Sequence, residues 1–248
     1  MTVRAPVSDL AEGERALPAE TSRYLCRVRR LGPGDRFVAF DPAAGAEADA
    51  TIVEASADAA RVVVGAPRPA RVLASAGLVL VYALAKGDKV DAVVRDATEL
   101  GATRVLVTRT ERAVVKASGE RAGDKLSRWR RVAEQAARQC GRSDPPAIDG
   151  VLAWDEALDR VAGCEARFCL DPRAPDALGG ALASAIERGA SIAFAVGPEG
   201  GLSAAEVDLA RAKGFLPASL GAFVLRTETV AAAVLGAVRV LEDRQRRP

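Results

Sequence analysis

The sequence predicts an α/β protein in two parts, a small β domain followed by a larger domain built on a mostly parallel sheet. The chain has 248 residues, which favours two domains because single domains cluster near ~100–150 residues. Residues 22–66 contain short β-like runs, whereas apolar runs alternate with amphipathic helical patterns from residue 77 onward. Hydrophobic residues make up 49% of the chain and charged residues 27%, a composition typical of a folded protein rather than a disordered one.

The first domain, residues 1–70, is expected to be a small β-sheet or β-barrel. Its apolar runs are short, and Gly-Pro-Gly, Asp-Pro and single glycines separate them. Residues 67–75 contain two prolines and are typical of a linker into the second domain, residues 71–248. The expected strands span residues 36–40, 50–55 and 60–66.

The second domain is expected to alternate strands and helices. Continuous apolar runs are typical of parallel strands buried on both faces, and amphipathic helices cover those faces. The first helix has its apolar face between Val90 and Leu100 and ends at Gly101. In sheets of this kind, ligands bind beyond the carboxyl ends of the strands. The expected strands span residues 77–84, 105–108, 168–170, 192–196 and 222–225, and further helices lie around Trp129, at 154–161 and at 229–241.

The composition excludes several classes of enzyme. Histidine is absent, which excludes Ser-His-Asp and Cys-His catalysis and removes the commonest metal ligand. Cys26, Cys140, Cys164 and Cys169 show no Cys-x-x-Cys spacing, so we expect free thiols in a reducing compartment and no metal site. The chain lacks an apolar signal-peptide core and any window approaching ~18 uninterrupted apolar residues. We therefore expect a cytoplasmic protein that does not span a membrane.

A glycine-rich loop follows the expected strand at 192–196. Gly197, Pro198, Glu199, Gly200 and Gly201 form it, and Ser-x-x-Glu at 203–206 has the spacing of a capping box that opens the next helix. The loop lacks the Gly-Lys-Ser/Thr of a phosphate-binding loop and the Gly-x-Gly-x-x-Gly of dinucleotide folds, which disfavours ATP and NAD. Its one charged residue is an acid, so a cationic or neutral adenosine-like ligand such as S-adenosylmethionine fits; a plain turn rich in glycine is the alternative.

A second polar segment, Arg226-Thr227-Glu228-Thr229, lies between the last expected strand and the last helix. This position is again at a carboxyl strand end, where side chains from several loops converge. Thr227 also has the chemistry of an N-cap, with Glu228 and Thr229 in the first turn. Both roles are compatible with one another.

Basic residues are concentrated in two regions. Between Arg104 and Asp144 there are eleven Lys or Arg residues and five acids, and residues 21–36 contain five arginines and one aspartate. Local positive charge of this kind favours a polyanion such as RNA, although a solvated helix face is the alternative. Because phosphate contacts release counterions, such binding is expected to weaken steeply with salt.

Four segments in order resemble the RsmE family, the 16S ribosomal RNA (uracil-N3)-methyltransferases of the SPOUT superfamily. They are KGDKVDAVVRDATELGATRVLVTRTERAVVK (86–116), RWRRVAEQAARQCGR (128–142), GPEGGLSAAEV (197–207) and LGAFVLRTETVAAAVLGAVRVLE (220–242). The resemblance covers roughly residues 20–243. It implies an α/β protein with an N-terminal PUA-like β-barrel that binds RNA and a C-terminal SPOUT domain with a deep trefoil knot, an exception to the rule that chains are unknotted.

The resemblance also implies the reaction, the partners and the site residues. S-adenosylmethionine would be the cofactor, the 16S ribosomal RNA or the small ribosomal subunit the substrate, and a homodimer the active form, with neither metal nor membrane involved. Arg226 and Glu228 would act near the transferred methyl group. The cofactor would contact Val196, Gly197, Pro198, Glu199, Gly200, Gly201, Leu220, Gly221, Leu225, Arg226 and Thr227. RNA would contact Arg109, Arg112, Lys116, Gln139 and Arg142, and the arginine-rich segment adds Arg23, Arg27, Arg29 and Arg30.

Methyl transfer from a sulfonium needs a positioned donor and acceptor more than it needs a metal. We expect Arg226 to stabilise charge that develops on the uracil ring, and Glu228 to orient Arg226 or accept the N3 proton. The family pattern differs here in three places: residues 20–35 contain no histidine, Asp96 replaces a usual lysine, and Val230 replaces a usual alanine. Two alternatives stay open, a non-catalytic RNA-binding protein of the same fold, and a SPOUT methyltransferase that acts on another base or on a ribose 2′-hydroxyl.

Overall fold

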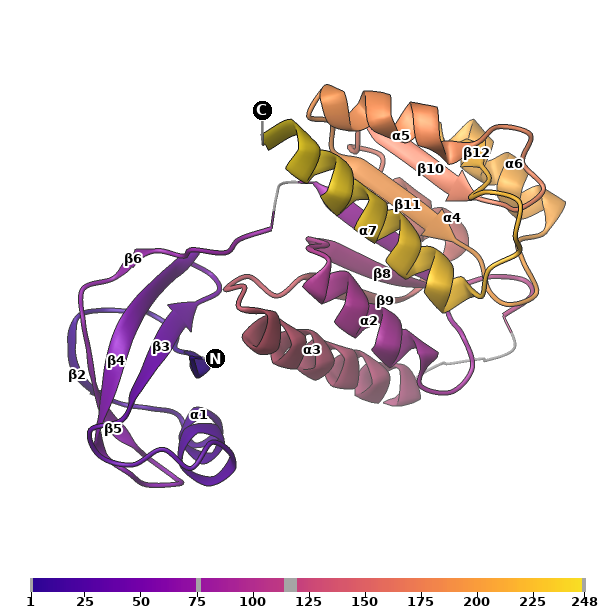
Figure 1. Cartoon of the computed structure of the whole chain (residues 1–248). Helices are drawn as coiled ribbons and strands as arrows, with labels where there is room; N and C mark the ends of the chain where they lie inside the picture. The colour runs from indigo at the N-terminus through magenta and orange to yellow at the C-terminus, as the bar shows by residue number, and fades with distance from the viewer. Residues whose placement is uncertain (1, 75–76, 114–119, 247–248) are drawn as a thin grey trace. The chain divides into compact units, whose positions relative to one another are not determined.

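The computed structural model describes residues 2–74, 77–113 and 120–246, and it divides into two compact units. The first unit contains residues 1–74 together with 134–145, and the second contains residues 75–133 and 146–248. Figure 1 shows the elements of both. The sequence places residues 134–145 in the second domain, whereas the structure groups them with the first unit.

The first unit is a mixed sheet with a short helical segment. The sheet order is β1-β3-β4-β5-β2, and β6 pairs with β4; β1 and β3 run parallel and the other pairs run antiparallel. Helix α1 (Ala19–Arg23) continues directly into the π-helical turn η1 (Tyr24–Val28). The strands are β1 (Arg4–Pro6), β2 (Gly13–Ala16), β3 (Arg36–Asp41), β4 (Ala46–Glu54), β5 (Arg61–Val64) and β6 (Arg68–Pro69).

The three strands expected in this unit are confirmed, because inward residues such as Phe37, Ile52 and Val62 are fully buried in its core. The expected linker is shorter than predicted. Arg68 and Pro69 form β6 against β4, and the Arg68 guanidinium donates two hydrogen bonds to the Asp49 carboxylate at 3.1 and 3.2 Å. The second proline of the segment, Pro69, therefore belongs to the sheet edge.

The second unit is a six-stranded sheet in which every pair is parallel, in the order β12-β10-β11-β7-β8-β9. Its strands are β7 (Leu78–Ala83), β8 (Arg104–Arg109), β9 (Ala147–Ala153), β10 (Ala166–Leu170), β11 (Ile192–Val196) and β12 (Leu216–Ala218). Its helices are α2 (Lys89–Glu99), α3 (Glu120–Cys140, whose last residues belong to the first unit), α4 (Trp154–Asp159), α5 (Leu178–Glu187), α6 (Ala204–Ala212) and α7 (Thr227–Arg246).

Helices cover both faces of this sheet, as the continuous apolar runs predicted. Alternate residues of β7 point to opposite sides: Leu80 and Tyr82 pack with α2, α5 and α7, whereas Val79 and Val81 pack with α4 and α6. Figure 1 shows α2, α5 and α7 on one side of the sheet. Because all six strands are parallel, the loops after their carboxyl ends gather at one edge.

The predicted strand at 222–225 is wrong. Residues 221–226 contain no helix or strand, and the sixth strand is instead Leu216–Ala218, which pairs with β10. Phe223 and Val224 are each 83% exposed, so the apolar run Ala-Phe-Val-Leu does not enter the core. The sequence analysis also missed β9, which contains Asp149 and Gly150, and α5, which begins with Leu178-Gly179-Gly180, because these residues weaken the strand and helix patterns.

Candidate active site

A cavity of about 610 Å³ lies at the carboxyl edge of the second unit's sheet. Loops after β10, β11 and β12 form its walls, and the first residues of α2 and α7 complete it. The structure places all the residues expected to contact the cofactor along this one cavity: Val196, Gly197, Pro198, Glu199, Gly200, Gly201, Leu220, Gly221, Leu225, Arg226 and Thr227. Their shared position agrees with a binding role, which stays a prediction.

The local structure of the loop after β11 requires glycine at two positions. A Cβ atom on Gly197 would lie 2.8 Å from Leu202 Cγ and 3.2 Å from the Leu202 backbone nitrogen. Gly201 has a φ of +68°, a backbone conformation that favours glycine, and its N–H donates to the Pro198 carbonyl at 2.8 Å. The loop is therefore a tight turn in which main chain, rather than side chain, borders the cavity.

The predicted capping box opens α6. The Glu206 backbone N–H donates to Ser203 Oγ at 3.3 Å, and the Ser203 backbone N–H donates to Glu206 Oε2 at 2.9 Å. The other carboxylate oxygen of Glu206 accepts the Glu111 backbone N–H at 2.7 Å. One glutamate thus fixes both the start of α6 and the loop after β8.

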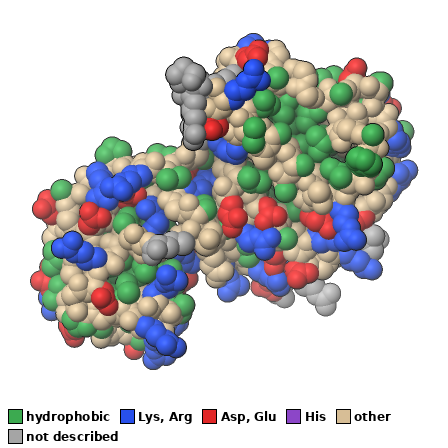
Figure 2. Space-filling view, in the orientation of Figure 1, with side chains coloured by type: hydrophobic (Ala, Val, Ile, Leu, Met, Phe, Trp, Pro, Cys, Tyr) green, Lys and Arg blue, Asp and Glu red, His purple; other side chains and the backbone are tan. Residues whose placement is uncertain are grey.

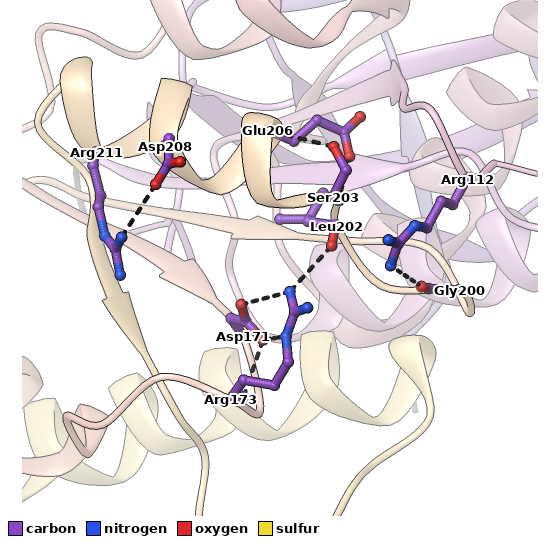
Figure 3. Close-up of polar contacts among 9 residues, drawn as sticks. All are labelled: Arg112, Asp171, Arg173, Gly200, Leu202, Ser203, Glu206, Asp208 and Arg211. Carbon is purple, nitrogen blue, oxygen red and sulfur yellow. Dashed lines mark hydrogen bonds and ion pairs between the residues drawn. The ribbon is translucent and has the colours of Figure 1, made fainter.

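Arg112 joins that same loop to the glycine loop. Its guanidinium donates to the Gly200 carbonyl at 3.2 Å, and its Cβ lies 3.2 Å from where a Cβ on Gly200 would stand (Figure 3). Arg112 was expected to contact RNA, and the structure places it in the wall of the cavity. A larger residue at position 200 would push the two loops apart.

Asp171 and Arg173 form a second support that the sequence analysis missed. The Arg173 guanidinium donates to both carboxylate oxygens of Asp171 at 2.9 Å and to the Leu202 carbonyl at 3.1 Å, so it lies between the two loops (Figure 3). Burial raises the pKa of Asp171, but the hydrogen bonds from Arg173 outweigh it and hold the pKa below its usual value. The available signal was position, since Asp171 directly follows β10 at its carboxyl end.

Lys89, the first residue of α2, joins two carboxylates of the site. Its ammonium lies 3.0 Å from Glu199 Oε1 and 3.3 Å from Glu228 Oε2. The hydrogen bond to Glu199 is the main cause that raises the Lys89 pKa. The hydrogen bond from its own backbone N–H and, to a lesser extent, the contact with Lys89 lower the pKa of the Glu228 carboxyl. Burial raises the pKa of the Glu199 carboxyl, but its backbone hydrogen bonds and its contact with Lys89 outweigh burial and lower the pKa. Both carboxyls therefore stay ionised at neutral pH.

Glu228 does not pair with Arg226 in the described part of the chain. Its carboxylate contacts Lys89 and lies 3.2 Å from Thr227 Oγ1, and it is not among the residues that line the cavity. Arg226 lines the cavity and is exposed. The expectation that Glu228 orients Arg226 directly finds no support in this geometry.

A buried hydrogen bond fixes the start of α7. Tyr82 of β7 and Thr227 share it between their hydroxyl oxygens, 2.8 Å apart. Burial raises the pKa of Tyr82 to about 12, so its hydroxyl stays neutral. This contact anchors the segment that carries Arg226 onto a central strand of the sheet.

The residues expected to contact RNA fall in different places. Arg23, Arg27, Arg29 and Arg30 are exposed on α1, η1 and the turn that follows them. Arg109 and Gln139 are exposed, the latter in the part of α3 that belongs to the first unit. Arg142 is buried, with its guanidinium 3.1 Å from the Asp144 carboxylate, so it supports the first unit from inside. Lys116 lies outside the described residues.

Within residues 2–74, 77–113 and 120–246, no group of three or more His, Cys, Asp or Glu side chains is placed to hold a metal ion. The same residues contain no helix that is long and apolar enough to cross a bilayer. The expected absence of a metal stays a prediction.

Comparisons with known proteins agree on one kind of relative. The family described as RNA methyltransferase domain matches residues 74–239, and the RNA methyltransferase PUA domain matches residues 17–65. Ribosomal RNA small subunit methyltransferase E of Mycobacterium bovis is 34% identical over 89% of this chain and 84% of its own, and that of Synechocystis sp. is 32% identical over 94% and 75%. The Neisseria gonorrhoeae protein of that name, solved bound to S-adenosyl methionine, superposes with a TM-score of 0.85 at 26% identity and covers 97% of this chain and 98% of its own.

Proposed function

The chain belongs to the ribosomal RNA small subunit methyltransferase E family, and on that premise we propose that it transfers a methyl group from S-adenosylmethionine to N3 of a uridine in 16S ribosomal RNA. Family membership confirms the predicted combination of a PUA-like N-terminal domain and a C-terminal α/β methyltransferase domain. It also makes the chain an S-adenosylmethionine-dependent RNA methyltransferase. The deep trefoil knot stays a prediction.

The observation that carries the proposal is the cavity, whose walls are formed largely by the main chain of three loops, none of which has the sequence of a phosphate-binding loop. The acids of its wall, Glu199 and Asp171, are already held by Lys89 and Arg173, so the support for S-adenosylmethionine comes from the glycine loop and from the relative solved with that cofactor. The glycine loop leaves backbone N–H and C=O groups within reach of an adenine and a ribose. Residues 196–201, 220–221 and 225–227 would hold the cofactor, which supplies an electrophilic methyl group.

Arg226 is the residue we assign to the reaction itself. When N3 of uracil loses its proton to water, negative charge spreads to the ring oxygens O2 and O4, and a guanidinium stabilises that charge. N3 then forms its bond to the methyl carbon as the bond from that carbon to sulfur breaks, and S-adenosylhomocysteine leaves. Arg226 is exposed at the cavity, directly before the buried Thr227, whose hydroxyl shares a hydrogen bond with Tyr82. Glu228 does not act on the substrate directly. Because it is held by Lys89 and its pKa is lowered, it is a poor proton acceptor, and we assign it to positioning Lys89 and the start of α7.

Replacement of Arg226 by Ala tests this assignment. Turnover should fall about a hundredfold to a thousandfold, the loss typical of removing one group that stabilises an oxyanion, while calorimetry still detects S-adenosylmethionine binding. Arg211→Ala is the matched control, since Arg211 is an exposed arginine that pairs with Asp208 on α6 outside the cavity (Figure 3). Unchanged turnover in folded Arg226→Ala would refute the assignment.

Mass spectrometry of ribosomal RNA nucleosides separates the remaining alternatives. Cells that lack the gene should lose 3-methyluridine from 16S RNA, and the wild-type gene should restore it. Loss of a different methylated base or of a 2′-O-methyl nucleoside would assign another SPOUT reaction. An unchanged nucleoside profile together with retained RNA binding would indicate the non-catalytic alternative.

We propose that the exposed arginines of the first unit bind the phosphates of the substrate RNA. Arg23, Arg27, Arg29 and Arg30 lie within one helical segment and its following turn, and no ion pair in the described residues neutralises them. Four arginine contacts to phosphate would give a large electrostatic contribution to the affinity, which salt weakens. Arg109 and Gln139 are further candidates on exposed surface, whereas the burial of Arg142 gives it a structural role.

We also propose a cytoplasmic homodimer. Residues 229–238 of α7 contain no charged side chain, even on the outer side of the helix, where charged residues are usually found. Thr229, Ala233 and Gly236 lie on this outer side, and Val234 and Val238 are buried on the opposite side. Val240, one turn further on, is 72% exposed. Figure 2 shows hydrophobic side chains gathered over this helix. A helix that is apolar all round is normally covered on every side, and a second copy of the chain would cover it. Free thiols in the described chain fit a reducing compartment.

Sedimentation tests the dimer. Gly236→Glu places a charge on the outer side of α7, where nothing lies within 4 Å of a Cβ atom, so the fold should persist while the dimer dissociates. Gly180→Glu, on the exposed side of α5 and equally free of neighbours, is the matched control. A wild-type protein that sediments as a monomer would refute the proposal.

A further inference from the structure

Phe223 stands apart from every other aromatic residue of the chain. The chain has six Phe, two Trp and two Tyr residues, all of them in the described ranges. Eight are buried and Tyr24 is half-buried beneath the Arg138 guanidinium, 4.7 Å from its ring centre. Phe223 alone is exposed, at 83%. An aromatic ring left in water forgoes the stabilisation that burial brings, so its exposure calls for a binding role.

The ring is held at the mouth of the cavity. Phe223 and its neighbour Val224 both line the cavity, in the loop between β12 and α7. This loop starts at Gly221, whose φ is +71°, and ends at Thr227, which the buried hydrogen bond to Tyr82 anchors. Figure 2 shows hydrophobic side chains gathered in the region of this loop, beyond α7. The loop thus presents an apolar surface next to Arg226, which lines the same cavity.

The chemistry of the acceptor requires such a surface. In a Watson–Crick pair the N3–H of uracil donates the central hydrogen bond, so N3 cannot accept a methyl group while the base is paired. The target base must therefore be unpaired and moved out of its stack, and it loses the contacts on its ring faces. Proteins that bind unpaired RNA bases replace those contacts with aromatic side chains.

We infer that Phe223 is the stacking surface for the target base, with Val224 as an apolar neighbour, and that it holds the pyrimidine ring over the cavity within reach of Arg226. The inference rests on the proposed function, because it assumes an RNA base as acceptor. Stacking on the ring fixes the plane of the base, while Arg226 contacts its edge. Phe223 is in this view a substrate-binding residue that positions N3, and it has no part in holding the cofactor.

Three variants test the role of the ring. Phe223→Ala removes it, Phe223→Leu keeps apolar volume without an aromatic face, and Phe223→Trp keeps the face. The substrate is small ribosomal subunits isolated from cells that lack the gene, and methyl transfer from labelled S-adenosylmethionine gives kcat/KM. Stacking of a base on an aromatic residue is worth about 1–3 kcal/mol, or roughly 5- to 150-fold.

We expect kcat/KM to fall by that factor in Phe223→Ala and nearly as much in Phe223→Leu, and to recover in Phe223→Trp. Calorimetric affinity for S-adenosylmethionine and the sedimented mass should match wild type in all three. Leu216→Ala, which truncates an exposed apolar side chain on β12 outside the cavity, is the matched control and should leave kcat/KM unchanged.

Three results would overturn the inference. They are wild-type kcat/KM in Phe223→Ala, full activity in Phe223→Leu, or dissociation into monomers that accompanies the loss, since this last would make Phe223 a contact with a second copy of the chain. Failure of the proposed function is distinguishable, because wild-type enzyme would then give no 3-methyluridine on the same subunits.

Discussion

Replacement of Gly197 by Ala gives a direct test of how the glycine loop is built. The added Cβ would lie 2.8 Å from Leu202 Cγ and 3.2 Å from Leu202 Cδ2, whereas carbon atoms in contact prefer about 3.5–4.0 Å. Leu202 has little freedom to move away, because its side chain is buried among the residues that pack under α4 and α6 and its carbonyl accepts a hydrogen bond from Arg173. The glycine loop must therefore shift.

Overpacking of this size costs about 1–3 kcal/mol of folding free energy, which corresponds to a fall in Tm of roughly 2–4 °C per kcal/mol for a protein of this length. Thermal unfolding measures the loss, and calorimetry should show weaker binding of S-adenosylmethionine because the displaced loop borders the cavity. Gly180→Ala is the control. It lies in α5 with nothing within 4 Å of the new Cβ, so it should be neutral or more stable by about 0.5–1 kcal/mol. If Gly197→Ala melted and bound like wild type, the close approach of Leu202 would not be the reason for glycine.

Three further predictions concern other parts of the molecule. Lys89→Met should lower the melting temperature at neutral pH. Because the pKa values of Glu199 and Glu228 are lowered, their ion pairs with Lys89 are fully formed above pH 4.5 and are lost as the pH falls below it. Because the pKa of Lys89 is raised, the ion pairs are complete up to pH 10.5 and are lost above it, so the melting temperatures of the two proteins should converge only outside this window. A constant difference down to pH 2 would contradict this. Tyr82→Phe should cost about 0.5–1.5 kcal/mol by removing the hydrogen bond to Thr227, measured by urea unfolding, and an unchanged midpoint would argue against that bond. Affinity for 16S RNA should fall steeply with salt, and Arg27→Gln should reduce the slope of log K against log salt by about one; equal slopes would remove Arg27 from the phosphate contacts.

The four inner strands of the second unit's sheet, β10, β11, β7 and β8, were predictable because they are largely buried on both faces, whereas the edge strands β12 and β9 were not predicted. Runs such as Ile192–Val196 are apolar at every position, and each residue of that strand is buried in the structure. The capping box of Ser203 and Glu206 was also predictable, because it depends only on residues that are close in the sequence. The strand predicted at 222–225 is wrong because an apolar run alone does not show that a segment is buried. Its apolar residues have a strand pattern, but no neighbouring strand is available, and Phe223 faces water.

The polar supports of the cavity were not predictable in the same way. Lys89 contacts Glu199 and Glu228, which are far from it in the sequence and far from each other. Their meeting depends on the order of strands in the sheet, since β11 and β7 are neighbours although β8, β9 and β10 intervene in the chain. Arg112 could be identified as a basic residue near a strand end, but its partner, the Gly200 carbonyl, is set by the same long-range order. Residue type and spacing predict which residues line this site. The contacts between its loops can be identified only when the order of the strands in the sheet is known.

The pairing of charges around the cavity supports the proposal that Arg226 acts on the substrate. Asp171 is satisfied by Arg173, and Glu199 and Glu228 share Lys89, so each acid of the site already has a cation within hydrogen-bond distance. Had Glu228 paired with Arg226, the guanidinium would have been neutralised before any substrate arrived. Because Lys89 takes that place, Arg226 has no ion-pair partner in the described part of the chain, and its charge is available to an acceptor that becomes anionic only as the methyl group is transferred.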